Sequence, residues 1–111
     1  MINQIDVREL AEAITRGEPI YLVDVRQPWE HQLAALPNST LLPLGELALR
    51  ADELSPPLGA LVVTYCHHGI RSLDAAAFLS RKWTAMGPKV ASLAGGIDRW
   101  SIEIDPTIRR Y

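Results

Sequence analysis

Cysteine is almost absent from this chain of 111 residues: Cys66 is the only one, so no disulfide can form within the chain. No apolar run approaches the ~20 residues needed to cross a bilayer, which excludes a membrane span. The N-terminal segment lacks the basic stretch and apolar run of a signal peptide. These absences predict a cytoplasmic protein whose one thiol is either a small buried apolar side chain or a reactive group.

An excess of charge of one sign is also lacking. Eleven Lys and Arg residues stand against 13 Asp and Glu residues, and the basic residues are scattered along the chain. A nucleic-acid-binding surface needs concentrated Lys and Arg, so nucleic acid is not an expected partner. With 48% hydrophobic and 22% charged residues, the composition is typical of a folded protein. We therefore expect residues 1–111 to form a single domain.

Segments typical of strands alternate with segments typical of helices. Asp6 and Glu9 form a capping pattern for a helix that Gly17 ends. Pro28 suits the first turn of a second helix that reaches about residue 35. Further helices are predicted over about 45–53, 72–83 and 97–100, and strands over 20–25, 40–42, 61–65 and 89–93. The alternation predicts an α/β domain with a mostly parallel sheet and reactive loops at the carboxyl ends of its strands.

Cys66 directly follows the strongest predicted strand and precedes a helix, with Gly69 inside the connecting loop and Arg71 at its end. Backbone amides of residues 67–72 could point into such a loop, and the start of the helix adds roughly half a positive charge. Arg71 would add a full positive charge. We expect an anion-binding loop that favours the thiolate of Cys66 and would equally stabilise an anionic persulfide.

The loop Cys66-His67-His68-Gly69-Ile70-Arg71-Ser72 resembles the active loop of the rhodanese homology domain. Three further segments resemble motifs of that family in the same order, over nearly the whole chain: Asp24-Val25-Arg26 with Glu30, Leu36-Pro37-Asn38-Ser39, and Leu93-Ala94-Gly95-Gly96-Ile97 with Trp100. The chain departs from the family at Ala34-Ala35, where Gly-His is frequent. Any role of that histidine is therefore absent here.

The resemblance implies a rhodanese-like α/β fold with a five-stranded, mostly parallel sheet flanked by helices on both faces. It also implies a sulfurtransferase without a cofactor. Cys66 would accept sulfane sulfur from thiosulfate or a persulfide donor and pass it to cyanide, a small thiol or a protein thiol. Cys66 and Arg71 are the predicted catalytic residues, and the predicted substrate-binding residues are His67, His68, Gly69, Ile70 and Ser72.

The tail from Ser101 to Tyr111 resembles the end of rhodanese modules attached to adenylyltransferases that load sulfur-carrier proteins. A sulfur-carrier or adenylyltransferase system is therefore a candidate partner. Two histidines beside a cysteine invite a metal interpretation, but neighbouring residues rarely ligate one ion with good geometry, and no further Cys or suitably spaced His completes a set. We predict that His67 and His68 hold no metal.

Four polar residues between the first predicted strand and the following helix are expected to have structural roles. Asp24 should form an ion pair or a helix cap. Arg26 and Glu30, four residues apart, should pair with each other across the helix start. His31 is expected to lie on the surface.

Two other functions remain open. Cysteine phosphatases and arsenate reductases also hold an oxyanion on a Cys-to-Arg loop, but they place one more residue between the two than the four that separate Cys66 from Arg71. The shorter loop is too tight for a tetrahedral phosphoryl group. A binding module on the same scaffold is the other alternative, with Cys66 used for redox sensing or not at all.

Overall fold

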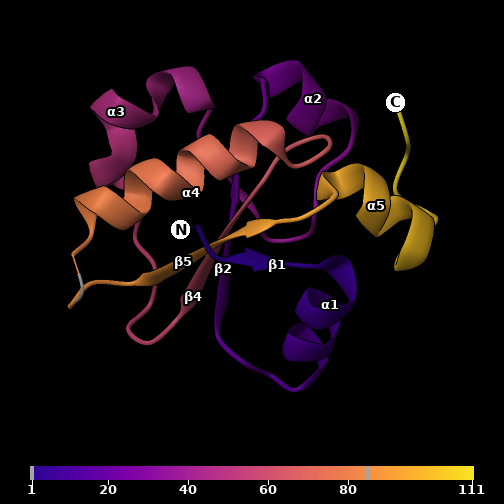
Figure 1. Cartoon of the computed structure of the whole chain (residues 1–111). Helices are drawn as coiled ribbons and strands as arrows, with labels where there is room; N and C mark the ends of the chain where they lie inside the picture. Colours follow the sequence, from indigo (N-terminus) through magenta and orange to yellow (C-terminus); the bar gives the residue numbers. More distant parts are fainter. Residues whose placement is uncertain (1, 85) are drawn as a thin grey trace.

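The computed structural model describes residues 2–84 and 86–111. Its sheet has the strand order β1-β5-β4-β2-β3, and every neighbouring pair is parallel (Figure 1). The strands are β1 (Gln4–Ile5), β2 (Ile20–Asp24), β3 (Thr40–Leu41), β4 (Leu61–Tyr65) and β5 (Lys89–Leu93). The helices are α1 (Val7–Thr15), α2 (Pro28–Leu33), α3 (Leu47–Arg50), α4 (Ile70–Lys82) and α5 (Gly96–Glu103), with short 3-10 turns at Leu44–Glu46 and Ala51–Glu53.

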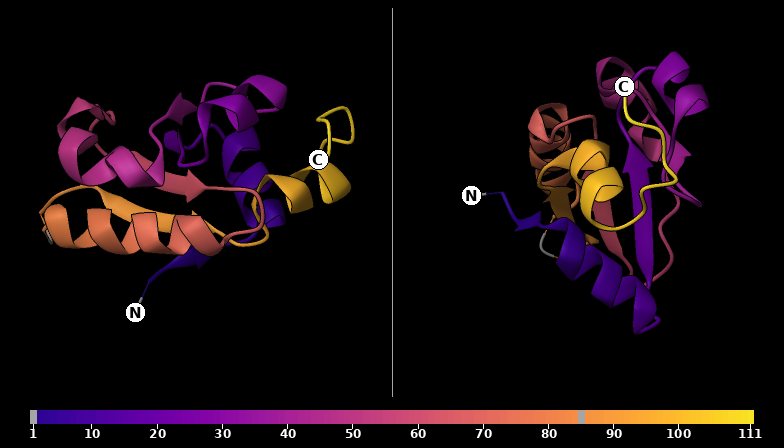
Figure 2. Two further views of the ribbon diagram at one scale, coloured as in Figure 1. Left: turned by 90° about the horizontal axis from the view of Figure 1, so that it is seen from above. Right: turned by 90° about the vertical axis from the view of Figure 1, so that its right-hand side faces the viewer.

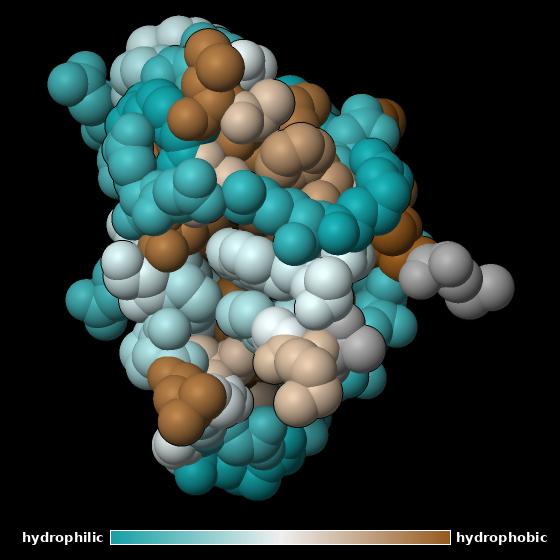
Figure 3. Space-filling model, turned by 90° about the vertical axis from the view of Figure 1, so that its left-hand side faces the viewer, coloured by the Kyte–Doolittle hydropathy of each residue, from teal (hydrophilic) through white to brown (hydrophobic). Residues whose placement is uncertain are grey.

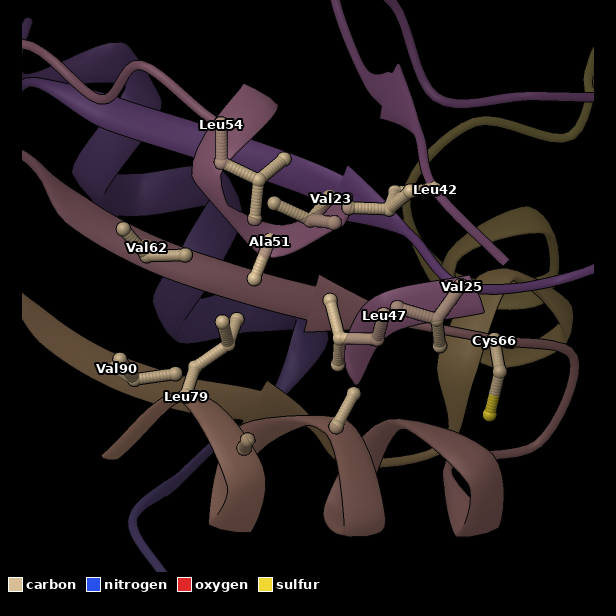
Figure 4. Packing of buried hydrophobic residues seen from close by; sticks show 12 residues of the cluster. Val23, Val25, Leu42, Leu47, Ala51, Leu54, Val62, Cys66, Leu79 and Val90 are labelled. Carbon is tan, nitrogen blue, oxygen red and sulfur yellow. The ribbon is translucent and has the colours of Figure 1, made fainter. Parts of the chain in front are cut away.

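Each face of the sheet carries its own hydrophobic core. Consecutive side chains of a strand point to opposite faces, so Val62 and Val63 of β4 belong to different cores. Residues of α3 and α4 pack with Val62 on one face (Figure 4), and residues of α1 and α5 pack with Val63 on the other. The predicted α/β fold with helices on both faces is confirmed (Figure 2).

Most predicted elements are present, but two helices differ and one strand was missed. The predicted helix over 45–53 is instead the short helix α3 between two 3-10 turns, and Leu47, Ala51 and Leu54 of this segment lie in the core. The last helix extends to Glu103 rather than Trp100. Strand β1 was not predicted, because it has only two residues and depends on its pairing with β5 at the sheet edge.

The carboxyl ends of the strands meet at one edge of the sheet, where α2, α4 and α5 also begin (Figure 1). The loop that carries Cys66 lies at this edge. Figure 3 shows the opposite end of the molecule, where hydrophobic side chains lie in several separate places among hydrophilic ones. Within the described residues, no helix is both long enough and apolar enough to cross a membrane.

Candidate active site

Cys66 lies between the end of β4 and the start of α4, with only 1% of its surface exposed (Figure 4). The backbone N–H groups of Gly69 and Ser72 donate hydrogen bonds to its sulfur, at 3.1 and 3.4 Å. Gly69 has a φ of 106°, and a Cβ there would lie 3.1 Å from the backbone nitrogen of Gly95. The loop therefore aims two amide donors at one sulfur atom, as expected of an anion-binding loop.

The turn before α5 holds this loop in shape. The first amides of α5 bind outward-facing carbonyl groups of the loop: Ile97 N–H donates to Cys66 O at 2.9 Å, and Asp98 N–H donates to His67 O at 3.1 Å. Gly96 has a φ of 61°, and a Cβ there would collide with both carbonyl oxygens. These two hydrogen bonds fix the start of the loop, whose later amides, from Gly69 and Ser72, face the sulfur.

A buried pair of serines borders the sulfur. Ser72 Oγ lies 3.6 Å from Cys66 Sγ and 2.7 Å from the hydroxyl of Ser92 on β5. The hydroxyl of Thr64 donates to the carbonyl of Ser72 at 2.8 Å, which fixes the first turn of α4. Ser72 was a predicted site residue, whereas Ser92 was missed. Ser92 is a polar residue among apolar buried residues of β5, and this could have marked it as a candidate site residue.

Arg71 forms a two-pronged ion pair with Glu30 of α2. Its Nη1 and Nη2 donate to the two carboxylate oxygens at 2.8 and 3.0 Å. Glu30 is only 3% exposed, and it also accepts hydrogen bonds from Gln27 N–H and the Tyr111 hydroxyl. Burial raises the pKa of Glu30, but the hydrogen bonds, led by those from Arg71, outweigh this effect and lower its pKa to about 2. The expected pairing of Arg26 with Glu30 is therefore wrong.

Arg26 turns back to Asp24 instead, because both lie at the end of β2. Its Nε and Nη2 donate to the carboxylate at 2.8 and 2.7 Å, which confirms the predicted ion pair of Asp24. His31 Nδ1 lies 2.8 Å from the same carboxylate, and the His31 side chain is half-buried, so the expected surface position holds in part. The start of α2 next to the end of β2 brings its second turn toward Asp24.

Tyr111 connects these two ion pairs to the active loop. Its hydroxyl donates to Glu30 at 2.7 Å and accepts from Arg26 Nη1 at 2.8 Å. Burial and the carboxylate of Glu30 raise the pKa of Tyr111 to about 12. Its ring stacks on His67 with 3.9 Å between centroids, and the C-terminal end lies beside α2 (Figures 1 and 2). No local sequence pattern pointed to this tyrosine.

The two histidines of the loop are stacked on each other, with 3.9 Å between ring centroids. Burial, and then the neighbouring His68, lower the pKa of His67, which favours the neutral imidazole. Their ring nitrogens and a carboxylate oxygen of Asp98 lie within 4.8 Å of one another. Asp98, which the sequence spacing did not reveal, is bound to Arg110 at 2.9 Å. Nε2 of His67 is buried and has no hydrogen-bond partner among the described residues.

The fold and the loop together define a class of protein: a parallel α/β domain with a buried cysteine on an amide-lined loop. The model of the Rhodanese-like domain family matches residues 6–103. The chain therefore belongs to the rhodanese-like domain family.

Known proteins similar to this chain include two curated relatives. A "Sulfurtransferase" of Allochromatium vinosum is 34% identical over 91% of this chain and 90% of its own length. The "Probable adenylyltransferase/sulfurtransferase MoeZ" of Mycobacterium tuberculosis is 28% identical over 98% of this chain, which spans only 27% of that protein. The crystal structure of a rhodanese-related protein from Thermoplasma volcanium is 28% identical, covers 98% of this chain and 99% of its own, and has a TM-score of 0.79. At the family level, these similarities support sulfurtransferase activity.

Proposed function

We propose that Cys66 accepts sulfane sulfur as a cysteine persulfide and passes it to a thiophilic acceptor. The observation that carries the proposal is the pair of backbone amides, from Gly69 and Ser72, aimed at a buried cysteine sulfur. Such donors favour a thiolate before the reaction and a persulfide anion after it, because both place negative charge on sulfur.

In the first step, the Cys66 thiolate attacks the outer sulfur of the donor. A bond forms between the two sulfur atoms, the sulfur–sulfur bond of the donor breaks, and sulfite or a thiolate leaves with the electron pair. Gly69 and Ser72 contribute backbone amides to the sulfur, and His68 and Ile70, the exposed residues of the loop, would contact the donor. Arg71, held by Glu30, closes the loop.

In the second step, a nucleophilic acceptor removes the outer sulfur and restores the thiolate. Cyanide, a small thiol and a protein thiol are all suitable acceptors, and neither step requires a cofactor. The similarity to MoeZ supports a sulfur-carrier or adenylyltransferase system as partner. A reducing compartment such as the cytoplasm would keep Cys66 available for each cycle.

Intact-mass spectrometry tests the first step. The reduced protein is treated with thiosulfate and separately with a persulfide donor, and we expect a gain of one sulfur atom that Cys66→Ser does not show. Failure of every donor to add sulfur would contradict the proposal and favour the binding module. Hydrolysis of an aryl phosphate without sulfur uptake would instead indicate a phosphatase.

A further inference from the structure

We infer that Glu30 determines donor specificity, so that the site prefers organic persulfides to thiosulfate. This inference rests on the proposed sulfur transfer at Cys66 and narrows its donor to one chemical class. It begins with the ion pair of Arg71 and Glu30, in which both carboxylate oxygens are bound at 2.8 and 3.0 Å.

The carboxylate is held in place from three sides. Besides Arg71, it accepts a hydrogen bond from Gln27 N–H at 3.0 Å and one from the Tyr111 hydroxyl at 2.7 Å. These hydrogen bonds outweigh the effect of burial, so Glu30 remains ionised at neutral pH and bound to Arg71. The charge of Arg71 is therefore already neutralised within the protein.

The other charged groups around the loop are also balanced. Arg26 is bound to Asp24 at 2.7 Å, and Arg110 is bound to Asp98 at 2.9 Å. Asp98 also lies 3.9 Å from Nε2 of His68, so a charge on that imidazole would face a carboxylate. The arginines surrounding Cys66 thus offer little net positive charge to an incoming anion.

The two donor classes differ in the charge that they bring to this neutral environment. Thiosulfate is a dianion, and its transfer releases sulfite, which is also anionic. The persulfide group of an organic donor carries at most one negative charge. The two amides identified at the loop, from Gly69 and Ser72, are both directed at the cysteine sulfur rather than at a position for a sulfonate group. Repulsion between the thiolate and the donor is therefore weaker for the persulfide.

Exposed apolar side chains flank the loop and suit the organic part of such a donor. Ile70, at the start of α4, is 76% exposed, and Trp29, next to Glu30 on α2, is 60% exposed. The ring of Trp29 lies edge-on to Tyr111, with 5.9 Å between centroids. An inorganic dianion gains nothing from these surfaces, whereas a hydrocarbon or peptide group can pack on them.

The inferred step is balanced in atoms and charge. The Cys66 thiolate attacks the outer sulfur of R–S–SH, a Cys66–S bond to that sulfur forms, and the R–S bond to it breaks. The thiolate R–S⁻ leaves with the electron pair and takes up the proton, which yields R–SH and the Cys66 persulfide anion. No separate oxidant or reductant is needed, because the persulfide already contains the oxidised sulfur.

The test compares rates of sulfur uptake by intact-mass time courses. Reduced protein is mixed with thiosulfate, with glutathione persulfide, or with a cysteine desulfurase supplied with cysteine, which presents a persulfide on a protein. We expect at least one of the two persulfide donors to load Cys66 with sulfur at least about tenfold faster than thiosulfate does. If glutathione persulfide is the faster donor, the preferred donor is a small molecule. If the cysteine desulfurase is faster, the preferred donor is a protein.

Glu30→Gln removes the negative charge but keeps an acceptor of similar shape. It should raise the ratio of the thiosulfate rate to the persulfide rates about tenfold by freeing the charge of Arg71. Glu53→Gln is the matched control, because it disrupts a Glu–Arg pair on an exposed surface, at 2.9 Å from Arg50. It should change none of the rates.

Thiosulfate loading of the wild type as fast as the persulfides would overturn the inference and leave the proposed function intact. Equal losses for all donors in a folded Glu30→Gln variant would also overturn it, because Glu30 would then act only in shaping the loop. The comparison of thiosulfate and persulfide rates in the wild type tests the donor preference even if the Glu30→Gln variant does not fold. If no donor loads the wild type, the proposed function itself fails.

Discussion

Arg26 has no exposed surface, although a buried guanidinium without partners would cost several kcal/mol. The cost is offset by the bidentate carboxylate of Asp24, the carbonyl of Ala34 and the hydroxyl of Tyr111. The same hydroxyl binds Glu30, so a single side chain satisfies a buried cation and a buried anion. This makes Tyr111 a stabilising residue.

Tyr111→Phe should therefore lower the free energy of unfolding by about 1–3 kcal/mol, since it leaves two charged groups each lacking a hydrogen bond. The ring and its stacking on His67 are kept. Urea denaturation followed by far-UV circular dichroism measures the change. Tyr21→Phe is the control, because the hydroxyl of Tyr21 accepts only one exposed hydrogen bond, from Ser55 N–H. A variant as stable as wild type would show that the Tyr111 hydroxyl contributes nothing.

The sequence predicts the site residues that are close together along the chain, but not those that only the fold brings together. Cys66, Gly69 and Arg71 share one loop, so their spacing was enough to predict an anion-binding loop. Glu30 lies 41 positions from Arg71, and a nearer candidate, Arg26, was chosen as its partner. Tyr111 lies 81 positions from Glu30 and showed no pattern at all.

At the scale of elements, the turn between β5 and α5 forms the base of the active loop. Gly96→Ala tests this, because its Cβ would collide with the carbonyl oxygens of Cys66 and His67. Gly59→Ala is the matched control: Gly59 also has a positive φ, of 83°, but nothing lies within 4 Å of its Cβ position. Both variants incur the backbone strain of about 1–2 kcal/mol, and only Gly96→Ala adds the collision.

We expect Gly96→Ala to lose at least about 1–3 kcal/mol more stability than Gly59→Ala, together with much of its sulfur uptake. Thermal denaturation and the intact-mass assay measure the two effects. Equal losses in both variants, with uptake unchanged, would mean that the turn does not shape the loop.

The helices and strands predicted best from the sequence are those with a characteristic local residue pattern. Strand β4 was predicted at its exact bounds because five apolar or β-branched residues end at a cysteine and a glycine-containing loop. The start of α1 was predicted from the capping box of Asp6 and Glu9, which the structure contains. The helix predicted over 45–53 is divided into α3 and two 3-10 turns, which its helical apolar spacing did not indicate. Strand β1 was missed because its two residues form a strand only by pairing with β5.

At the scale of the whole molecule, Glu30 links stability to pH. Its pKa is about 2 in the folded protein and near its ordinary value of 4.5 in the unfolded chain. The ionised carboxylate therefore stabilises the fold above about pH 5, and this contribution is lost as the pH falls toward 2. The contribution of this carboxylate amounts to about 3 kcal/mol at neutral pH.

Glu30→Gln should consequently lose less stability than the wild type between about pH 5 and pH 2. Denaturant titrations at a series of pH values measure the difference. Asp98 and Glu53 also have lowered pKa values, through Arg110 and Arg50, but they contribute equally to both proteins. If the free energy of unfolding changed with pH in the same way in both proteins, the stabilising role of the Glu30 carboxylate would be contradicted.

The whole sheet serves to place one sulfur at its carboxyl edge, where β4, α4 and the turn before α5 meet. We propose that this sulfur accepts a second sulfur atom and passes it to an acceptor. The most direct test is a single turnover: the protein is loaded with a persulfide donor, freed of excess donor, and mixed with cyanide. We expect one thiocyanate for each Cys66 persulfide and a return of the protein to its mass before loading. A sulfur adduct that persists without forming thiocyanate would contradict it.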